Sequence, residues 1–266
     1  MLKKIVLVVV VVTLSSFLVA QAGNRGKAAI SADTTCAYTF SSGAGLNATQ
    51  FCVTANGNIT QFSNPAGNDH IAGTWPSEGY AICDFTPATP VAYYDYATND
   101  SANWLPPTLL SSTATAVKLS RATSDGIWQI TQTITKVNAT AMSPGSAKVA
   151  MAVKNTSGIA RSAYVIRYVD IDANGGYTDD DQLSSFRQYT GQDAFSYGLA
   201  LTSNTTATLV ESVILNSNGI GPDPCNPAAL WAGSAAFHGD GSGFLWYVAT
   251  FPKNGTKTFN MTYKAF

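Results

Sequence analysis

The segment QFCVTANGNITQF, residues 50–62, is the part of the chain that most clearly indicates the fold class. Gln50–Thr54 and Ile59–Phe62 are short runs rich in residues that favour β-strands, and Asn56-Gly57 lies between them. An Asn-Gly pair readily adopts the positive φ values that a type I′ turn requires. The segment therefore predicts a β-hairpin.

Short strand-like runs separated by Gly, Asn, Asp and Pro continue along the rest of the chain. In the run after Asp125-Gly126, Thr131, Thr133 and Thr135 share one face, which suits a solvated sheet face. No apolar stripe of helical period persists, so helical turns are expected only at 179–186 and 227–232. The expected strands cover residues 115–121, 127–135, 147–154, 163–169, 197–202, 207–213, 244–250 and 258–263.

These observations predict an all-β protein, a large antiparallel two-sheet β-sandwich. The alternative is two tandem smaller sandwiches divided at the proline-marked segment Trp104–Pro107. We expect residues 36–266 to form a single sandwich, because the strand-like composition is the same on both sides of that segment.

The composition of the 266 residues excludes several classes of protein. Hydrophobic residues make up 45% of the chain, which is enough for a substantial core. Only 12% are charged, too few for a coiled coil, and the net charge of −1 gives no basic footprint for nucleic acid.

The amino terminus has the features of a secretory signal peptide. Lys3 and Lys4 precede an apolar run, and Ala20-Gln21-Ala22 supplies the small residues of a cleavage site. An uncleaved membrane anchor is the alternative, but the apolar run is short for a bilayer span. We therefore expect residues 1–22 to be removed, residues 23–35 to form a flexible leader, and the mature protein to be extracellular or periplasmic.

Four cysteines are present, an even number that suits disulfides in an oxidising compartment. Three pairings are possible. We expect Cys36–Cys52, because both residues lie in short strand-like segments that can pair locally, and Cys83–Cys225 then follows by elimination.

Asn-X-Ser/Thr triplets are frequent in the sequence. In an exported eukaryotic or archaeal chain they are candidate glycosylation sites, although a chain rich in Thr, Ser and Asn makes several by chance. The asparagines are Asn47, Asn58, Asn99, Asn138, Asn155, Asn204, Asn254 and Asn260.

Residues 170–181, DIDANGGYTDDD, have the spacing of a calcium-binding loop. Asp170, Asp172 and Asn174 place oxygen-bearing side chains at alternate positions, and Gly175 permits the turn that follows them. Ca²⁺ prefers six to eight oxygen ligands, so alternate residues of a tight loop must point inward. Gly176, through its carbonyl, and Thr178 and Asp181 are the remaining candidate ligands.

This loop resembles EF-hand loops, and more closely the Asp-ended loops of extracellular modules such as dockerins. The resemblance covers twelve residues and implies a bound calcium ion. Asp181 is one methylene shorter than the Glu that usually ends such loops, and the flanking residues have strand character. We therefore carry over ion binding only, and an acidic solvated loop is the alternative.

No established catalytic motif accompanies the other reactive side chains. Asp69-His70 and His238-Gly239-Asp240 contain the only histidines, and no nucleophile elbow is present. A glycosidase requires two facing carboxyl groups, and the spacing of the available carboxylates selects no pair. The carboxylates considered are Glu78, Asp84, Asp95 and Glu211, and the aromatic residues considered as a sugar platform or as core are Tyr80, Tyr93, Tyr94, Trp104 and Trp231.

The sequence therefore predicts a secreted, calcium-stabilised β-sandwich with a binding, adhesion or structural role outside the cell. One alternative is a polysaccharide lyase or glycoside hydrolase built on a large sandwich. Another is a subunit of an extracellular filament, in which the leader adds a strand to a neighbouring sheet. The expected partners are glycans or further copies of the chain, without nucleic acid and without a membrane once the signal is cleaved.

Overall fold

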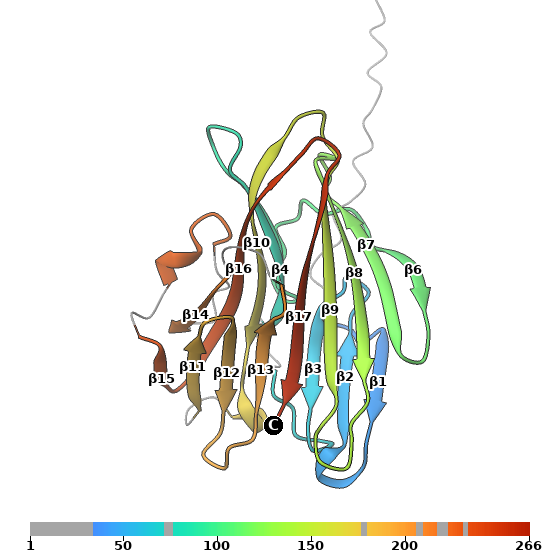
Figure 1. Ribbon diagram of the computed structural model, residues 1–266, viewed down its shortest axis with the longest axis vertical. Coiled ribbons are helices and arrows are strands. Elements are labelled where there is room, and N and C mark those ends of the chain that lie inside the picture. The colour runs from blue at the N-terminus through green and yellow to red at the C-terminus, as the bar shows by residue number, and fades with distance from the viewer. Residues whose placement is uncertain (1–33, 72–76, 177–179, 206–209, 217–222, 231–233) are drawn as a thin grey trace, which may run out of the picture.

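The computed structural model describes residues 34–71, 77–176, 180–205, 210–216, 223–230 and 234–266. These residues form antiparallel strands joined by turns and short 3-10 helices, which confirms the all-β sandwich prediction (Figure 1). The predicted signal peptide and most of the predicted leader lie outside the described residues. In the described part of the chain, no helix reaches the length and apolar character that crossing a bilayer takes.

The strands form three antiparallel sheets. The three-stranded sheet contains β1 (Tyr38–Ser42), β2 (Thr49–Val53) and β3 (Ile59–Ser63). The five-stranded sheet has the order β14 (Val210–Asn216), β16 (Gly241–Phe251), β10 (Arg161–Asp170), β4 (Glu78–Asp84) and β5 (Val91–Asp95). The nine-stranded sheet has the order β15 (Ala236–His238), β11 (Asp181–Ser185), β12 (Gln188–Gln192), β13 (Gly198–Ser203), β17 (Thr256–Ala265), β9 (Ser146–Asn155), β8 (Trp128–Val137), β7 (Ala116–Ala122) and β6 (Thr108–Ser112).

The described residues also contain three short 3-10 helices: η1 (Gly45–Asn47), η2 (Ala173–Gly175) and η3 (Pro227–Leu230). The prediction of a helical turn at 227–232 is confirmed by η3. The prediction of a helical turn at 179–186 is wrong, because 181–185 form β11. In β11 the buried Gln182 alternates with the exposed Asp181 and Leu183, as expected for a strand between two others.

The inner faces of all three sheets share one apolar core. Along β8, buried Trp128, Ile130 and Ile134 alternate with half-buried threonines, which confirms that Thr131, Thr133 and Thr135 share the outer face of the sheet. The same cluster contains Phe51 from the three-stranded sheet and Val165 from the five-stranded sheet. Core residues thus come from both sides of the segment Trp104–Pro107.

The predicted hairpin is present as β2 and β3, but its turn is not of type I′. Among the turn residues, only Gly57 has a positive φ, +91°. The Gly57 N–H donates to the Thr54 carbonyl, and the Thr54 hydroxyl accepts the N–H groups of Asn56 and Asn58. The side chain of Thr54 therefore stabilises a five-residue connection in place of the two-residue turn.

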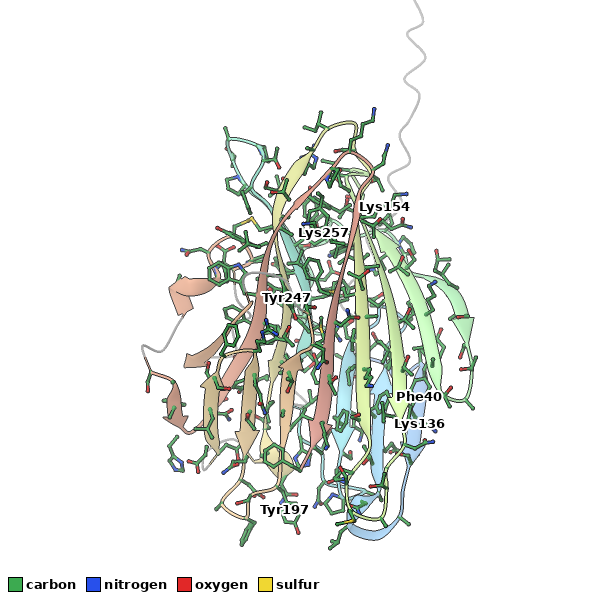
Figure 2. All side chains as sticks on the ribbon, in the orientation of Figure 1. Phe40, Lys136, Lys154, Tyr197, Tyr247 and Lys257 are labelled. Atoms are coloured by element: carbon green, nitrogen blue, oxygen red, sulfur yellow. A yellow bond between two sulfur atoms is a disulfide. The ribbon has the colours of Figure 1, made fainter. Side chains whose placement is uncertain are left out.

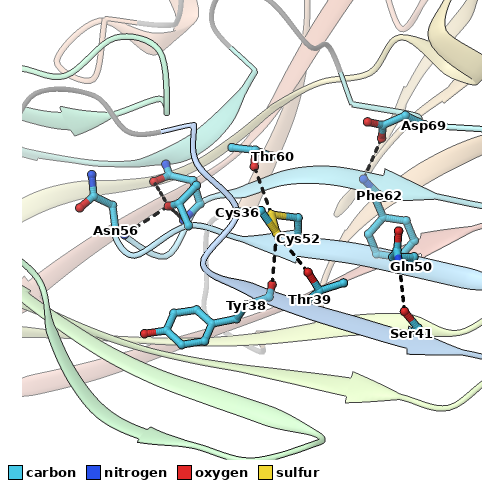
Figure 3. The surroundings of a disulfide bond; sticks show 12 residues. Cys36, Tyr38, Thr39, Ser41, Gln50, Cys52, Asn56, Thr60, Phe62 and Asp69 are labelled. Carbon is cyan, nitrogen blue, oxygen red and sulfur yellow. Dashed lines mark hydrogen bonds between the residues drawn. A yellow bond between two sulfur atoms is a disulfide. The ribbon is translucent and has the colours of Figure 1, made fainter. Parts of the chain in front are cut away.

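Both predicted disulfides are confirmed. Cys36 precedes β1 and bonds to Cys52 of β2, with the Cα atoms 5.5 Å apart (Figure 3). Cys83 of β4 bonds to Cys225, which lies 142 residues later in the sequence. The second bridge fixes the segment around η3 to the five-stranded sheet.

Two buried ion pairs add polar contacts to the core. Arg167 of β10 lies 2.5 Å from Glu78 of β4, and Tyr263 of the nine-stranded sheet donates a hydrogen bond to Glu78. Arg121 of the nine-stranded sheet pairs with Asp95 of β5. The Tyr263–Glu78 hydrogen bond and the Arg121–Asp95 ion pair connect the nine-stranded sheet to the five-stranded sheet through the interior.

Candidate metal centre

Strand pairing brings three aspartates together at one end of the five-stranded sheet. β10 ends at Asp170, and the register of β10 with β16 places Asp170 opposite Ser242. Asp240 precedes Ser242 by two residues, and Asp172 follows Asp170 by two. One carboxylate oxygen from each of the three aspartates lies within 4.8 Å of the other two.

The cluster is partly removed from water. Asp170 is 4% exposed, while Asp172 and Asp240 are half-buried. Among the described residues, no hydrogen-bond donor contacts Oδ1 of Asp170, although this atom is buried. A buried carboxylate oxygen without a partner is costly in a folded protein, and a bound cation would supply the partner that the described residues do not.

The electrostatics of the three aspartates oppose ionisation in the absence of a cation. Burial raises the pKa of Asp170 well above its ordinary value, and the neighbouring Asp172 and Asp240 raise it further. Burial and the charge of Asp240 also raise the pKa of Asp172 to about 6. A divalent cation bound between the carboxylates would reverse both effects by stabilising the ionised forms.

The chemistry of these ligands suits calcium. Carboxylates are hard oxygen donors, and each one can bind Ca²⁺ through one or both oxygens. The cluster contains no sulfur or imidazole donor of the kind that zinc usually takes. Asp170, Asp172 and Asp240 are therefore the residues that would hold such an ion.

The structure brings together only part of the predicted ligand set. Asp170 and Asp172 lie in the cluster, whereas Asp181 lies in β11, where its Oδ1 is 3.0 Å from Nδ1 of His238. Asp181 thus stands apart from the cluster of three aspartates, since its side chain is about half exposed and pairs across the sheet, and its role as a ligand stays a prediction. Thr178 lies outside the described residues.

Asn174 and Gly176 follow the cluster in a small pocket of about 230 Å³ that Asp180 and Asp193 also line. Asn174 has a φ of +58°, and the N–H of Gly176 donates to the Ala173 carbonyl. Neither residue belongs to the cluster of three carboxylates, so their predicted roles as ligands stay predictions.

The loop after Asp172 is fixed by two side chains. Asp180 accepts a hydrogen bond from the Ala173 N–H at 2.7 Å. Nδ1 of His70 accepts the Asn174 N–H, and Nε2 of His70 lies 2.7 Å from the carbonyl oxygen of Asn64. Burial lowers the pKa of His70, which keeps the imidazole neutral, as this pair of contacts requires. His70 is thus a support for the loop.

Asp240 belongs to the cluster although its position in the sequence does not indicate this. The motif His238-Gly239-Asp240 drew attention to this region as a histidine–carboxylate pair, but His238 pairs with Asp181 instead. Only the register between β10 and β16 shows that Asp240 lies beside Asp170.

The other candidate residues have structural partners. Glu78 and Asp95 are fully buried in the two ion pairs, and Asp84 lies 2.5 Å from Arg161. Glu211 and Trp231 are not described at the side-chain level. The aromatic residues Tyr80, Tyr93 and Trp104 lie in the core, and Tyr94 is half-buried.

Two of the eight candidate glycosylation sites are inaccessible in the folded chain. Asn58 and Asn155 are fully buried, and their amide groups donate hydrogen bonds to backbone carbonyls. Glycosylation stays a prediction for the six others, which are exposed or half-buried: Asn47, Asn99, Asn138, Asn204, Asn254 and Asn260.

Comparison with known proteins identifies the fold and no family. Neither a family model nor a curated protein sequence matches the chain. Among solved structures, a bacterial glucoamylase complexed with acarbose matches with a TM-score of 0.62 and 9% identity, over 90% of this chain and 33% of that one. A galactose mutarotase-like protein from Lactobacillus casei matches with a TM-score of 0.53 and 7% identity, over 86% of this chain and all of that one.

A polysaccharide lyase also matches, with a TM-score of 0.51 and 12% identity, over 84% of this chain and 33% of that one. The chain thus spans about a third of the length of the glucoamylase and of the lyase. Its β-sandwich fold is one that carbohydrate-active proteins also use.

Proposed function

We propose that the protein is an exported β-sandwich that a calcium ion stabilises and that binds carbohydrate outside the cell without catalysis. The observation that carries the proposal is the buried, unpartnered Oδ1 of Asp170 within the cluster of three aspartates. Because Asp170 is almost fully buried, an ion bound there connects the end of β10 to the start of β16 and does not meet a large substrate.

Three further features support this role. The two disulfides suit an oxidising compartment, as does the predicted signal peptide. The fold is shared with proteins that act on carbohydrates, which favours glycans as the partner class. Most of the carboxylates first considered for catalysis are held in buried ion pairs.

A carbohydrate-active enzyme is the second candidate. One oxygen from each carboxylate of the cluster lies within 4.8 Å of the others, close to the separation of about 5–5.5 Å in retaining glycosidases, and the pKa of Asp172 is raised to about 6, as for a general acid. The burial of Asp170 argues against it, because a glycosidic bond must reach both carboxylates.

Two measurements test the proposal. Chelation of calcium should lower the melting temperature of the wild-type protein, and added Ca²⁺ should restore it; a melting temperature that ignores both would refute the ion site. The protein should also bind members of a polysaccharide panel without releasing reducing ends or unsaturated products. Release of either product that an Asp172→Asn variant abolishes would favour the enzyme.

A further inference from the structure

Every lysine that the structure describes lies on one part of the nine-stranded sheet or on the turn beside it. These lysines are Lys118 in β7, Lys136 in β8, Lys148 and Lys154 in β9, Lys257 and Lys264 in β17, and Lys253 in the turn before β17. Figure 2 shows Lys136, Lys154 and Lys257 on this part of the molecule. The net charge of −1 for the whole chain conceals this segregation.

Four of the lysines project from the outer face of the sheet. Lys148 and Lys154 alternate along β9 with buried Val149 and Val153, and the same alternation places Lys118 and Lys264 on this face. Lys148 is paired with Thr262, so Lys264 is its diagonal neighbour on the adjacent strand. We call Lys118, Lys148, Lys154 and Lys264 the basic face.

No acidic residue lies on the strands that carry or flank the basic face. Strands β6, β7, β8, β9, β13 and β17 contain no Asp or Glu. Among the described residues, none of the ion pairs involves a lysine. The ammonium groups of Lys148 and Lys264 repel one another as diagonal neighbours, and a bound anion would relieve that repulsion.

A groove of about 480 Å³ lies on the same face with Lys148 in its lining. Its other side-chain donors and acceptors are hydroxyl and amide groups, from Thr133, Thr135, Asn204, Asn260 and Thr262. Such groups match the hydroxyls of sugars, whereas an ammonium group matches a carboxylate or sulfate.

The face lacks the features that neutral sugars and single-stranded nucleic acids use. The aromatic side chains of β7, β8, β9, β13 and β17 are Trp128, Phe259 and Tyr263, and all three are buried in the core. Stacking on sugar rings or on bases is therefore unavailable, and charge must supply much of the affinity.

We propose that the basic face binds a linear acidic polysaccharide, with its uronate or sulfate groups on Lys148 and Lys264 and its hydroxyls in the Thr- and Asn-lined groove. This inference rests on the proposed carbohydrate-binding function and specifies the ligand class and the surface. Binding of the polysaccharide and glycosylation at Asn204 or Asn260 exclude each other, because a glycan on either residue would fill the groove.

The test is a binding measurement on the mature chain, residues 23–266, produced in a bacterial periplasm so that disulfides form and no N-glycan is added. The probes are polygalacturonate and chondroitin sulfate, with dextran as the neutral polymer and a single-stranded oligonucleotide as the other polyanion. Wild type should bind one or both acidic polysaccharides, and raising the salt from about 50 mM to about 300 mM should weaken that binding.

Lys148→Gln/Lys264→Gln should weaken binding by about tenfold or more, since both lysines would meet the ligand's charges. The matched control is Lys253→Gln/Lys257→Gln, which removes the same charge from the turn and the start of β17 and should change binding less than about twofold. Equal losses in the two variants would overturn the proposal, because they would show an effect of net charge alone.

Three other outcomes would also overturn it. Equal binding of dextran would leave carbohydrate binding intact but refute the acidic ligand. Tighter binding of the oligonucleotide would reassign the face to nucleic acid. Absence of binding to every polysaccharide would refute the proposed function as well.

Discussion

Asp170 is the residue whose chemistry most constrains this protein. A strand end places its carboxylate inside the molecule, beside two further carboxylates and without a donor for Oδ1 among the described residues. An apolar side chain at this position would leave no buried polar atom without a partner. The position of Asp170 is explained if the three aspartates hold a cation.

Asp240 and Asp181 are two candidate calcium ligands near the loop, and their substitutions can be compared directly. Asp240→Asn should abolish the rise in melting temperature that Ca²⁺ produces, since a neutral amide is a weaker ligand for calcium. Asp181→Asn should retain that rise, because Asp181 pairs with His238 outside the cluster. Thermal unfolding with and without Ca²⁺ measures both. The reverse result would restore the twelve-residue loop predicted from sequence.

The raised pKa of Asp172 gives the metal-free protein a specific dependence on pH. Its pKa is about 6 in the folded chain against 3.8 as its ordinary value, so between these values the folded state binds more protons than the unfolded state. The contribution of Asp172 to stability is thus present below about pH 4 and is lost as the pH rises through 6.

Comparison of wild type with Asp172→Asn isolates this effect from the other carboxylates. In chelator, the melting temperature of wild type should fall relative to the variant as the pH rises from about 4 to about 7. Added Ca²⁺ should remove the difference in slope. A constant difference between the two proteins across this range would contradict the assigned pKa.

The sequence predicts Asp170 and Asp172 because alternate acidic residues beside a glycine are recognisable from spacing alone. Asp240 was not predictable in this way, since it joins the cluster through the pairing of β10 with β16, seventy residues apart in the sequence. Asp181 lies at the end of the loop pattern in residues that form a strand, so spacing alone does not place it beside the other aspartates.

The hairpin of β2 and β3 shows how one turn connects several strands. Asn58 donates hydrogen bonds to the carbonyls of Glu78 and Asp95, and the carbonyl of Asn56 accepts the hydroxyl of Tyr80. An Asn-Gly turn is ordinarily expected to be exposed to solvent, but this one is buried between sheets. Composition indicates a turn at this place but not its burial.

Gly57 tests this packing. A Cβ at Gly57 would lie 2.4 Å from Nε2 of Gln132, and the φ of +91° disfavours any other residue. Gly126 is the matched control, because its φ is +71° but no atom lies within 4 Å of an added Cβ. Gly126→Ala should lower the free energy of unfolding by about 1 kcal/mol from backbone strain alone.

Gly57→Ala should cost about 2–3 kcal/mol, because the Gln132 side chain must also move. Denaturant unfolding measures both variants. Equal costs would show that Gln132 accommodates the methyl group and that the turn is not closely packed.

Across the whole molecule, buried charges join the two sides of the sandwich. Arg167 contacts Glu78 at 2.5 Å and donates to Tyr263 and to Gln132, so one guanidinium connects β10 and β4 to β17 and β8. Both charges of such an ion pair lose hydration on burial. Removal of the whole pair therefore costs less stability than removal of one partner, which leaves the other charge buried and unpaired.

Arg167→Met should therefore lower the free energy of unfolding by about 3–5 kcal/mol, because Glu78 is left buried and unpaired. The double variant Arg167→Met/Glu78→Gln should recover much of this loss. Denaturant unfolding of the two variants and wild type provides the measurement. A double variant no more stable than Arg167→Met would show that Arg167 contributes to stability through its packing and not through its pairing with Glu78.

The sandwich, its two disulfides and most of its long strands follow from sequence because alternation and turn residues are local signals. The split into three sheets does not, since it depends on which strands pair across long separations. The sequence also does not predict the strands β4, β5, β6, β11, β12 and β15; β4 is buried on both faces and β6 is exposed on both, so neither alternates.

Isothermal titration of the chelator-treated protein with Ca²⁺ measures directly whether the three aspartates bind the ion. We expect saturable binding at one site in wild type and no measurable heat in the Asp170→Asn/Asp172→Asn variant, which should fold because it removes two mutually repelling charges. No heat with wild type at millimolar Ca²⁺, or an unchanged isotherm in the double variant, would exclude a calcium site at these aspartates.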